Sequence, residues 1–388
     1  MKILGMISGT SYDGIDCSIG DFTIDGNAIL LNPLFTRTHE YPAETYALIN
    51  RSMPPAKIDY QIVCEIDTLI GQAFAEAAAL AIKESGITPD LIVAHGQTMY
   101  HWISPEGKAL GTLQVGDAAR VAELNGIPVL SQLRSRDVAA GGQGAPFASL
   151  IDHMLLAARN INCGALNLGG ISNMTVIRPG QDTVAFDVGP ANALMDAAVR
   201  IYSDGSENFD RDGALGAQGK VNDAILGEML KEPYYALSYP KSTGKELFNH
   251  DYLKSWMARY PEVSMLDWIA TLTILTATTI ANEFNKLDVS EVFVSGGGLH
   301  NKTLMAQLNS LTRNVKYLPY EDLGLSSDGK EAYLFALIGF LSMHNLPGNI
   351  PSSTGASGPR ILGSLSPGKS GFPAVANISE ALIGLRII

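Results

Sequence analysis

Several features that mark common classes of protein are missing from this sequence. No window holds the ~18 consecutive apolar residues that a transmembrane helix needs. The start, MKILGMISGTS, has too short an apolar stretch, interrupted by glycine, for a secretory signal. The sequence has no cluster of Lys and Arg, and its net charge of −12 disfavours nucleic acid and anionic membranes as partners. We therefore expect a cytoplasmic protein that acts on a small molecule.

Cysteine is also scarce. The chain has three cysteines, Cys17, Cys64 and Cys163, which are scattered through apolar sequence. Disulfide frameworks and zinc sites need paired or clustered thiols, so we expect three buried free thiols. With 388 residues, of which 46% are hydrophobic, the chain is long enough to form two domains.

Short apolar runs alternate with runs of strong helix formers, a pattern typical of α/β proteins. The apolar runs end in glycine or a small polar residue and predict strands. A tail rich in proline, glycine and serine, 346–373, predicts irregular chain, followed by a short helix or strand in 374–385. The predicted strands are Ile3–Ile7, Leu91–Ala94, Ala165–Leu168, Thr183–Phe186 and Glu291–Val294, and the predicted helices are Leu69–Lys83, Asp267–Phe284 and Glu331–His344.

The order of these elements repeats along the chain. Near the start, one strand runs into the turn SGTSYDG and a later strand ends in LIVAHGQ. From Cys163 the order recurs in ALNLGGISNMTVI and in EVFVSGGGLHN. Two related halves that face each other would direct four glycine turns into one cleft.

Glycine turns of this kind suit phosphate groups. Backbone N–H groups without a Cβ beside them approach an anion closely, and Ser and Thr hydroxyls add donors. A nearby carboxylate can hold Mg²⁺, which prefers oxygen ligands. Taken alone, a cluster such as SGTSYDG at Ser8–Gly14 is more often a plain β-hairpin turn. Its recurrence as GGIS and SGGG favours a phosphate and magnesium site.

A second phosphate pattern has the wrong context. The segment Gly363–Ser370, GSLSPGKS, fits the P-loop pattern of glycine, four residues and Gly-Lys-Ser. A P-loop must open a helix, whereas Gly371-Phe372-Pro373 follows here and only 18 residues remain after Ser370. We therefore predict that this segment does not bind nucleotide.

Polar residues gather where loops would meet a substrate. HGQT at His95–Thr98 follows a strand, and RSRDVAAGGQGAP from Arg134 to Pro146 packs cations, an acid and glycines into a bend. His95 and His101 lack a third ligand at suitable spacing, so a hydrogen-bonding role is favoured over a metal site.

Two carboxylates have competing interpretations. Asp187 ends an apolar strand before Gly-Pro, where it is either a helix cap or, at the mouth of a cleft, a general base. Glu331 opens an apolar helix, where a carboxylate interacts favourably with the helix N-terminus without any further role.

Ten segments occur in an order that is similar to that of the anhydro-N-acetylmuramic acid kinase family. They are MISGTSYDGID, AHGQTMYH, QVGD, DVAAGGQGAPF, NLGGISNMT, FDVGPANALMD, PKSTGKELF, ATLTILTA, VSGGGLHN and KEAYLFA. The resemblance runs over residues 1–367, nearly the whole chain. Family members usually have Asp-Phe-Arg where this chain has Gln132-Leu133-Arg134, so the arginine is kept.

The resemblance implies an α/β, actin-like sugar kinase fold. This fold has two domains of duplicated, ribonuclease H-like topology with the active site in the interdomain cleft, in agreement with the internal repeat. We expect one domain in residues 1–133 and 355–388 and the other in 134–354. A homodimer is also implied.

Carried over residue by residue, the resemblance implies that Asp187 is the catalytic base. It implies ATP and Mg²⁺ as cofactors, with Asp13 and Glu331 near the metal. The residues implied on the sugar side are His95, Gln97, Thr98, Arg134 and Asn173, and those implied at ATP are Gly9, Thr10, Ser11, Tyr12, Asp13, Gly14, Ile15, Asp16, Gly169, Gly170, Gly296, Gly297, Gly298 and Asn301.

The implied reaction opens the 1,6-anhydro ring of anhydro-N-acetylmuramic acid and phosphorylates O6. Its product would be N-acetylmuramic acid 6-phosphate in cell-wall sugar recycling. Two alternatives stay open. A related branch phosphorylates levoglucosan, which lacks the N-acetyl and lactyl groups, and actin-like or chaperone ATPases act as non-catalytic nucleotide switches on the same fold. The presence of both Asp187 and Arg134 favours the enzyme.

Overall fold

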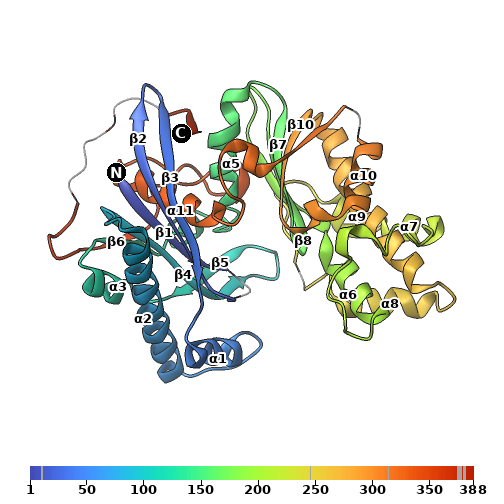
Figure 1. Ribbon diagram of the computed structural model, residues 1–388, viewed down its shortest axis with the longest axis horizontal. Coiled ribbons are helices and arrows are strands. Elements are labelled where there is room, and N and C mark those ends of the chain that lie inside the picture. Colours follow the sequence, from blue (N-terminus) through green and yellow to red (C-terminus); the bar gives the residue numbers. More distant parts are fainter. Residues whose placement is uncertain (10–11, 245, 313, 374–377, 379–381) are drawn as a thin grey trace. The chain divides into compact units, whose positions relative to one another are not determined.

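The computed structural model describes residues 1–9, 12–244, 246–312, 314–373, 378 and 382–388 (Figure 1). The chain forms two compact units. Unit 1 comprises Met1–Ala158 and Leu323–Ile388, and unit 2 comprises Arg159–Asp322. These bounds differ from the expected ones at 133/134 and 354/355, because helix α5 (Ala148–Leu156) packs on helix α11 (Lys330–Met343) and on strand β13 (Gly384–Ile387). The flanking segments therefore belong to unit 1.

Unit 1 is built on one mixed sheet with the strand order β12-β6-β4-β1-β2-β3-β13, with β5 paired to β4. Strands β1, β2 and β3 form an antiparallel meander, and β4 lies parallel to β1 on its other side. The long hairpin β2–β3 is drawn in blue in Figure 1. The bounds are β1 Lys2–Ser8, β2 Ile15–Asp25, β3 Ala28–His39, β4 Leu91–Ile103, β5 Ala109–Val115, β6 Val129–Ser131 and β12 Ser364–Ser366.

Helices cover both faces of this sheet. The buried side chains Leu4 and Met6 of β1 pack in one hydrophobic cluster with helix α2 (Tyr60–Ser85). On the other face α11 approaches β1 so closely that a Cβ at Gly5 would lie 1.9 Å from the Ala332 carbonyl oxygen. The remaining helices of unit 1 are α1 Ala43–Ser52, α3 Ala118–Asn125, α4 Ser135–Ala139 and α12 Pro351–Thr354.

Unit 2 repeats the topology of unit 1. Its strand order, β11-β10-β7-β8-β9, matches β6-β4-β1-β2-β3, and in both orders two parallel pairs are followed by two antiparallel pairs. The predicted duplication and ribonuclease H-like fold are therefore confirmed. The bounds are β7 Cys163–Leu168, β8 Ile171–Ile177, β9 Val184–Pro190, β10 Glu291–Ser295, β11 Lys316–Pro319, α6 Asn192–Tyr202, α7 Asp223–Met229, α8 His250–Arg259, α9 Met265–Leu287 and α10 Lys302–Leu311.

The three predicted helices are present as α2, α9 and α11, of which α2 begins nine residues earlier than expected at Tyr60, where Asp59 caps it. Two expected turns are wrong. Strand β4 continues through Gly96, whose φ of +76° and close approach to Val115 only bend it. Strand β9 likewise continues through Gly189 to Pro190. Cys64, expected to be buried, is exposed.

The segment that fits the P-loop pattern is part of the sheet edge. Residues Ser364–Ser366 form β12, which pairs antiparallel with β6. Lys369 lies in a turn closed by a bridge between Gly368 and Gly371, and its backbone N–H donates to Gly126. Residues 374–377 and 379–381 of the expected final element lie outside the described residues, and β13 ends the chain. Within the described parts of the chain, no helix has the length and hydropathy of a membrane span.

Candidate active site

Asp187 lies on β9 with its carboxylate fixed by a neighbouring loop. Its Oδ2 accepts hydrogen bonds from Ser242 Oγ at 2.7 Å and from the Thr243 backbone N–H at 3.0 Å. Its backbone is held as well, because Asp187 N donates to Lys241 O and Tyr234 Oη donates to Asp187 O. Its Oδ1 accepts no hydrogen bond from the residues that the structure describes. One carboxylate oxygen is thus anchored and the other is available.

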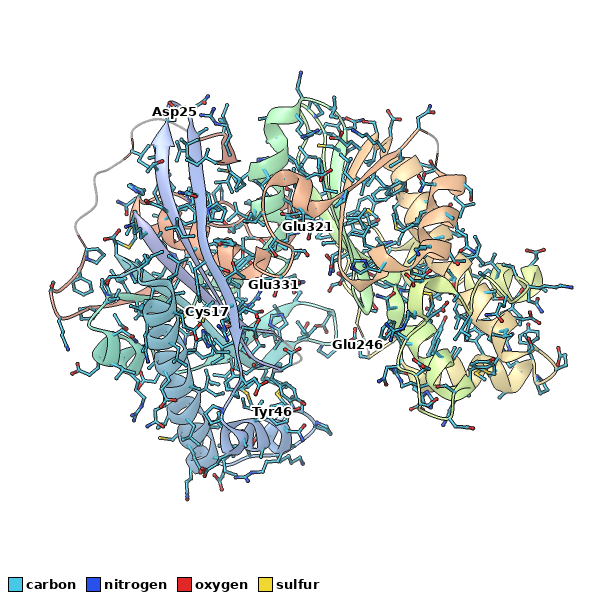
Figure 2. All side chains as sticks on the ribbon, in the orientation of Figure 1. Cys17, Asp25, Tyr46, Glu246, Glu321 and Glu331 are labelled. Atoms are coloured by element: carbon cyan, nitrogen blue, oxygen red, sulfur yellow. The ribbon has the colours of Figure 1, made fainter. Side chains whose placement is uncertain are left out.

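The groups around Asp187 shift its pKa in opposite directions. Burial raises the pKa of the carboxyl group, the hydrogen bonds from Thr243 and Ser242 lower it, and the charge of Glu246 raises it. Glu246 lies on the same unit (Figure 2). The helix-cap interpretation of Asp187 is wrong, because the residue lies inside β9 and Ala191 occupies the N-cap position of α6.

Asn173 and the first glycine pair lie next to this carboxylate in the same sheet. Asn173 on β8 is the register partner of Asp187 on β9. Gly169 and Gly170 form the β7–β8 turn, and their carbonyls accept the first N–H groups of the α6 region, those of Ala191, Asn192 and Ala193. The turn and the helix start are therefore one rigid element.

The second glycine cluster packs directly on the β7–β8 turn. A Cβ at Gly296 would lie 2.6 Å from Asn167 Oδ1, and one at Gly298 would lie 2.7 Å from Leu168 Cβ, so side chains there would separate the two segments. Gly297 is exposed and lines a cavity of 330 Å³ with Asn192, Met195, Phe209, His300 and Asn301. Cavities of this size hold small ligands.

Asn301 also has a structural role in this wall. Its Oδ1 accepts the Leu304 N–H at 2.9 Å and so caps helix α10. Asp196, a residue that the sequence analysis did not single out, lines the same cavity. Burial raises the pKa of Asp196 to about 6, with the Arg200 charge lowering it and Asp210 raising it. The cavity therefore combines apolar side chains with amide and carboxyl groups.

In unit 1 the predicted phosphate segment joins β1 to β2 as a hairpin turn. The Gly9 carbonyl accepts the Tyr12 N–H at 3.1 Å and Gln97 Nε2 at 3.2 Å. At Gly14 a Cβ would lie 2.6 Å from Thr38, so β3 leaves room only for glycine. Tyr12 donates to Asn50 on α1, and Ile15 is buried in the core. Thr10 and Ser11, which complete the segment, lie outside the described residues.

Residues predicted on the sugar side gather around Arg134. His95 Nδ1–H donates to the Gly96 carbonyl, so its Nε2 is an acceptor, and Arg134 Nε–H donates to it at 2.7 Å. Burial and the charge of Arg134 lower the pKa of His95 to about 3. Burial also lowers the pKa of Arg134 to about 10, while Glu331 and Asp137 raise it. Thr98 accepts from Gln114 on the neighbouring strand β5.

The acidic residues of unit 1 lie close enough to influence one another. Burial raises the pKa of Asp16, a hydrogen bond from Thr38 lowers it, and the charges of Asp13 and Asp328 raise it. Glu331 is exposed in the first turn of α11 (Figure 2), yet desolvation by the surrounding protein raises its pKa, with Arg134 opposing and Asp16 reinforcing the rise. Among the described residues, no group of three His, Cys, Asp or Glu is placed to hold a metal ion.

Two groups that shape these sites have no functional role that the sequence predicts. Asp137 is fully buried and accepts from Asn349, Thr354 and the Gly144 N–H, which fixes the bend after Arg134. The segment PKST, quoted only as a motif, supplies both donors to Asp187. The only local sign of this role in the sequence is a serine and a threonine beside a lysine.

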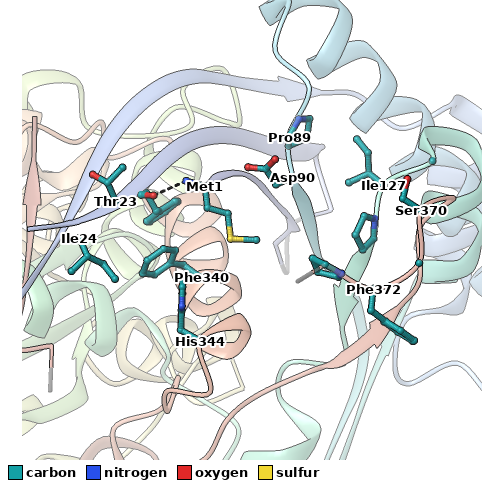
Figure 3. A pocket seen from close by; sticks show the side chains of 15 residues that line it. Met1, Thr23, Ile24, Pro89, Asp90, Ile127, Phe340, His344, Ser370 and Phe372 are labelled. Carbon is teal, nitrogen blue, oxygen red and sulfur yellow. Dashed lines mark hydrogen bonds between the residues drawn. The ribbon is translucent and has the colours of Figure 1, made fainter. Parts of the chain in front are cut away.

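A larger cavity of 660 Å³ lies elsewhere in unit 1 (Figure 3). It is lined by Met1, Asp90, Ile127, Phe340 and Phe372, residues at the amino ends of β1, β4 and β6 and on elements beside them. Ligands of α/β sheets bind at the carboxyl ends of the strands instead. This cavity contains none of the predicted site residues.

Comparison with known proteins gave consistent matches over the full chain. Residues 1–368 match the family model described as anhydro-N-acetylmuramic acid kinase. An anhydro-N-acetylmuramic acid kinase of Rhodococcus erythropolis is 47% identical, covering 100% of this chain and 99% of that protein. The proteins of the same name from Streptomyces coelicolor and Caldanaerobacter subterraneus are 46% and 37% identical, covering 100% and 94% of this chain and 99% and 96% of theirs. Among solved structures, a ROK hexokinase from Thermus thermophilus is 15% identical with a TM-score of 0.35, covering 88% of this chain and 99% of that chain.

Proposed function

Because the chain belongs to the anhydro-N-acetylmuramic acid kinase family, we propose that it uses ATP to open and phosphorylate anhydro-N-acetylmuramic acid, with Asp187 as the general base. The product is N-acetylmuramic acid 6-phosphate, an intermediate of cell-wall sugar recycling. The observation that carries the role of Asp187 is its carboxylate geometry, in which Oδ2 is anchored by two donors and Oδ1 accepts no hydrogen bond from the described residues.

In the proposed reaction, ring opening and phosphoryl transfer occur in one concerted event. The oxygen of a water molecule forms a bond to C1, the C1–O6 bond breaks, and one water proton passes to Asp187 Oδ1. O6 forms a bond to the γ-phosphorus of ATP as the bond to the β-phosphate oxygen breaks, which releases ADP. The chain's own contribution is to position the reactants and to stabilise charge, as in other phosphoryl transfers.

We assign the nucleotide to the glycine segments. Gly9–Asp16, Gly169 and Gly170 would meet the phosphates, since their backbone can approach an anion closely. Gly296–Gly298 and Asn301 would line the adenosine, in keeping with the exposed Gly297 in the 330 Å³ cavity. Asp13 and Glu331 are the proposed environment of Mg²⁺, which would neutralise phosphate charge when bound. Isolated carboxylates fit this ion, because Mg²⁺ keeps waters and phosphate oxygens as its other ligands.

We assign the sugar to His95, Gln97, Thr98, Arg134 and Asn173. In the described part of the chain, the guanidinium of Arg134 donates to His95 and to the Gly144 carbonyl, neither of which is negatively charged, so we assign its charge to the lactyl carboxylate of the muramic substrate. We therefore expect kcat/KM to be higher for anhydro-N-acetylmuramic acid than for levoglucosan. A tenfold preference for levoglucosan, about 1.4 kcal/mol in transition-state binding, would refute this substrate assignment.

Isotope labelling tests the reaction. In ¹⁸O-labelled water, we expect the label at C1 of the sugar product and unlabelled oxygen in the transferred phosphate. Label in the phosphate would mean that water attacks phosphorus, and the chain would then act as an ATPase-like switch. The same reactions, followed by ADP release, give the rates.

One further property is implied by the family resemblance and a second is expected from the sequence. We propose that the enzyme is a homodimer and acts in the cytoplasm, where ATP is available. Light scattering of the purified chain measures the first, and fractionation of cells that express it measures the second.

A further inference from the structure

Lys241 is a buried cation in unit 2 with a complete set of partners. The residue is only 7% exposed, and its Nζ lies 3.1 Å from Glu283 Oε1 and 3.2 Å from the Tyr235 carbonyl. The ring centroids of Tyr234 and Phe186 lie 5.3 and 5.6 Å from the same nitrogen. Aromatic faces stabilise a desolvated ammonium group. The charge is therefore compensated entirely inside the protein.

The partner Glu283 ties this cation to the helical core. Glu283 lies on α9, beside the buried residues Ile280 and Phe284. Its Oε2 accepts from the Tyr239 hydroxyl and lies 3.8 Å from Lys286 Nζ. The loop 238–243 is thus anchored to α9 through two of its side chains, Tyr239 and Lys241.

The same loop holds the carboxylate of Asp187. The Lys241 carbonyl accepts the Asp187 N–H at 3.1 Å, and the next two residues, Ser242 and Thr243, donate to Oδ2. Ser242 itself is exposed, so packing does not fix it. The nearest anchor along the chain is the buried ammonium group of Lys241.

We propose that the ion pair between Lys241 and Glu283 positions Asp187, by fixing the Ser242–Thr243 donors so that Oδ2 is held and Oδ1 faces the reacting water. Lys241 is a positioning residue, because it contacts the loop and the helix and not the substrate. This inference rests on the proposed role of Asp187 as the base. A buried ion pair contributes little net stability compared with apolar side chains of the same size, so geometry is the role that this pair can fill.

Lys241→Met tests the proposal, since methionine keeps the unbranched shape of the side chain, is one atom shorter and removes the charge. We expect kcat to fall about 10- to 100-fold, the range that a misplacement of about 1 Å produces, with ATP affinity unchanged. Lys286→Met is the matched control, because Lys286 is an exposed lysine on the other oxygen of the same Glu283, and its kcat should remain unchanged. Equal kcat values in the wild type and in folded Lys241→Met would overturn the proposal.

The pH profile separates positioning from a general loss of stability. Among the described residues, the charged or ionisable groups that act on Asp187 are Glu246 and Tyr234, with Lys241 and Glu283 behind the loop. The bonds from Ser242 and Thr243 lower the pKa of Asp187, so their loss raises it, and the acid limb of kcat should move to higher pH. A lower melting temperature with kcat per folded enzyme and acid limb unchanged would show a purely structural role.

Glu283→Gln covers the case in which Lys241→Met does not fold. Glutamine keeps the size and a carbonyl acceptor, so we expect a smaller loss of kcat in the same direction, with the same movement of the acid limb. An unchanged acid limb in Glu283→Gln contradicts the proposal. Ser242→Ala, combined with either variant, should add less than its own effect, because all three act through one carboxylate.

Asp187→Asn distinguishes a failure of this inference from a failure of the proposed function. If Asp187→Asn is inactive while both ion-pair variants turn over normally, Asp187 remains the base and the positioning role is wrong. If Asp187→Asn turns over normally, the base assignment is wrong and the positioning role is lost with it.

Discussion

The two units have the same sheet order but treat their key cations differently. In unit 1, Arg134 donates to His95, which is neutral, and to the Gly144 carbonyl. In unit 2, Lys241 forms an ion pair with Glu283. The described partners of Arg134 carry no negative charge, whereas the charge of Lys241 is compensated within the protein. This difference is why we propose a recognition role for Arg134 and a positioning role for Lys241.

Arg134 differs from Lys241 because its partner His95 is neutral. Its Nδ1–H is used by the Gly96 carbonyl, so only the unprotonated Nε2 can face the guanidinium of Arg134. A carboxylate in that place would neutralise the arginine as Glu283 neutralises Lys241.

The largest effect should come from Asp187, the carboxylate that we propose Lys241 to position. Asp187→Asn keeps the size of the side chain but cannot take a proton from water. Turnover should fall by at least ~10²-fold while ATP binding persists. Coupled ADP release gives the rate, and calorimetry gives the nucleotide affinity. Turnover close to that of the wild type would show that Asp187 is not the base. Lys241 would then have no positioning role.

The next effect should come from the unit 1 cation. Arg134→Met removes the charge, and a hydrogen bond to a charged group contributes about 1.5–3 kcal/mol, so kcat/KM for anhydro-N-acetylmuramic acid should fall about 10- to 100-fold. Levoglucosan has no carboxylate and serves as the control, with a clearly smaller loss expected. Equal losses for both sugars would mean that Arg134 acts only through the Gly144 bend.

A smaller, pH-dependent effect should follow from His95. Its pKa is lowered to about 3 in the folded chain, so the unfolded chain takes up the proton first as the pH falls below ~6.5. Stability from this group is therefore present above that pH and lost below it, by about 1 kcal/mol between pH 7 and 5.5. Urea unfolding of the wild type and of His95→Gln at both pH values measures it. The variant should lose about 1 kcal/mol less than the wild type.

The smallest effect is expected at the P-loop pattern, which has no counterpart in the sheet of unit 2. Lys369→Ala should leave ATP affinity unchanged, since Lys369 lies in a turn of the sheet edge and packs on Gly126. Calorimetry with ATP provides the measurement. A clear loss of ATP binding would show that the segment Gly363–Ser370 contributes a phosphate site to unit 1, contrary to our prediction.

The sequence predicted best where one short pattern determines an element. The apolar runs of β1, β7 and β10 and the helices α2, α9 and α11 were placed correctly. Neither strand of the hairpin β2–β3 was predicted, and in β3 the proline is a signal against a strand. In the structure Pro33 pairs with Gly20 beside a register shift, which accommodates the proline.

The candidate site also contains some features that a local pattern predicts and others that it does not. The glycine turn at Gly169–Gly170 and the place of Asp187 on a strand have local signals, whereas the turns expected at Gly96 and Gly189 are parts of strands β4 and β9. The link between Lys241 and Glu283 spans 42 residues and depends on the tertiary fold, so no local pattern reveals it. The hydrogen bond between Arg134 and His95 spans 39 residues and was hidden for the same reason.

The close approach of α11 to β1 has a consequence for how mutations in this enzyme are interpreted. Alanine at Gly5 would place a methyl group 1.9 Å from the Ala332 carbonyl oxygen, so the helix would have to move outward. Glu331 precedes Ala332 in the first turn of that helix and would move with it. With Glu331 in the proposed environment of Mg²⁺, alanine at Gly5 would then disturb that environment from within strand β1. In a genetic screen, we therefore expect changes at Gly5 and at Glu331 to fall into one functional class.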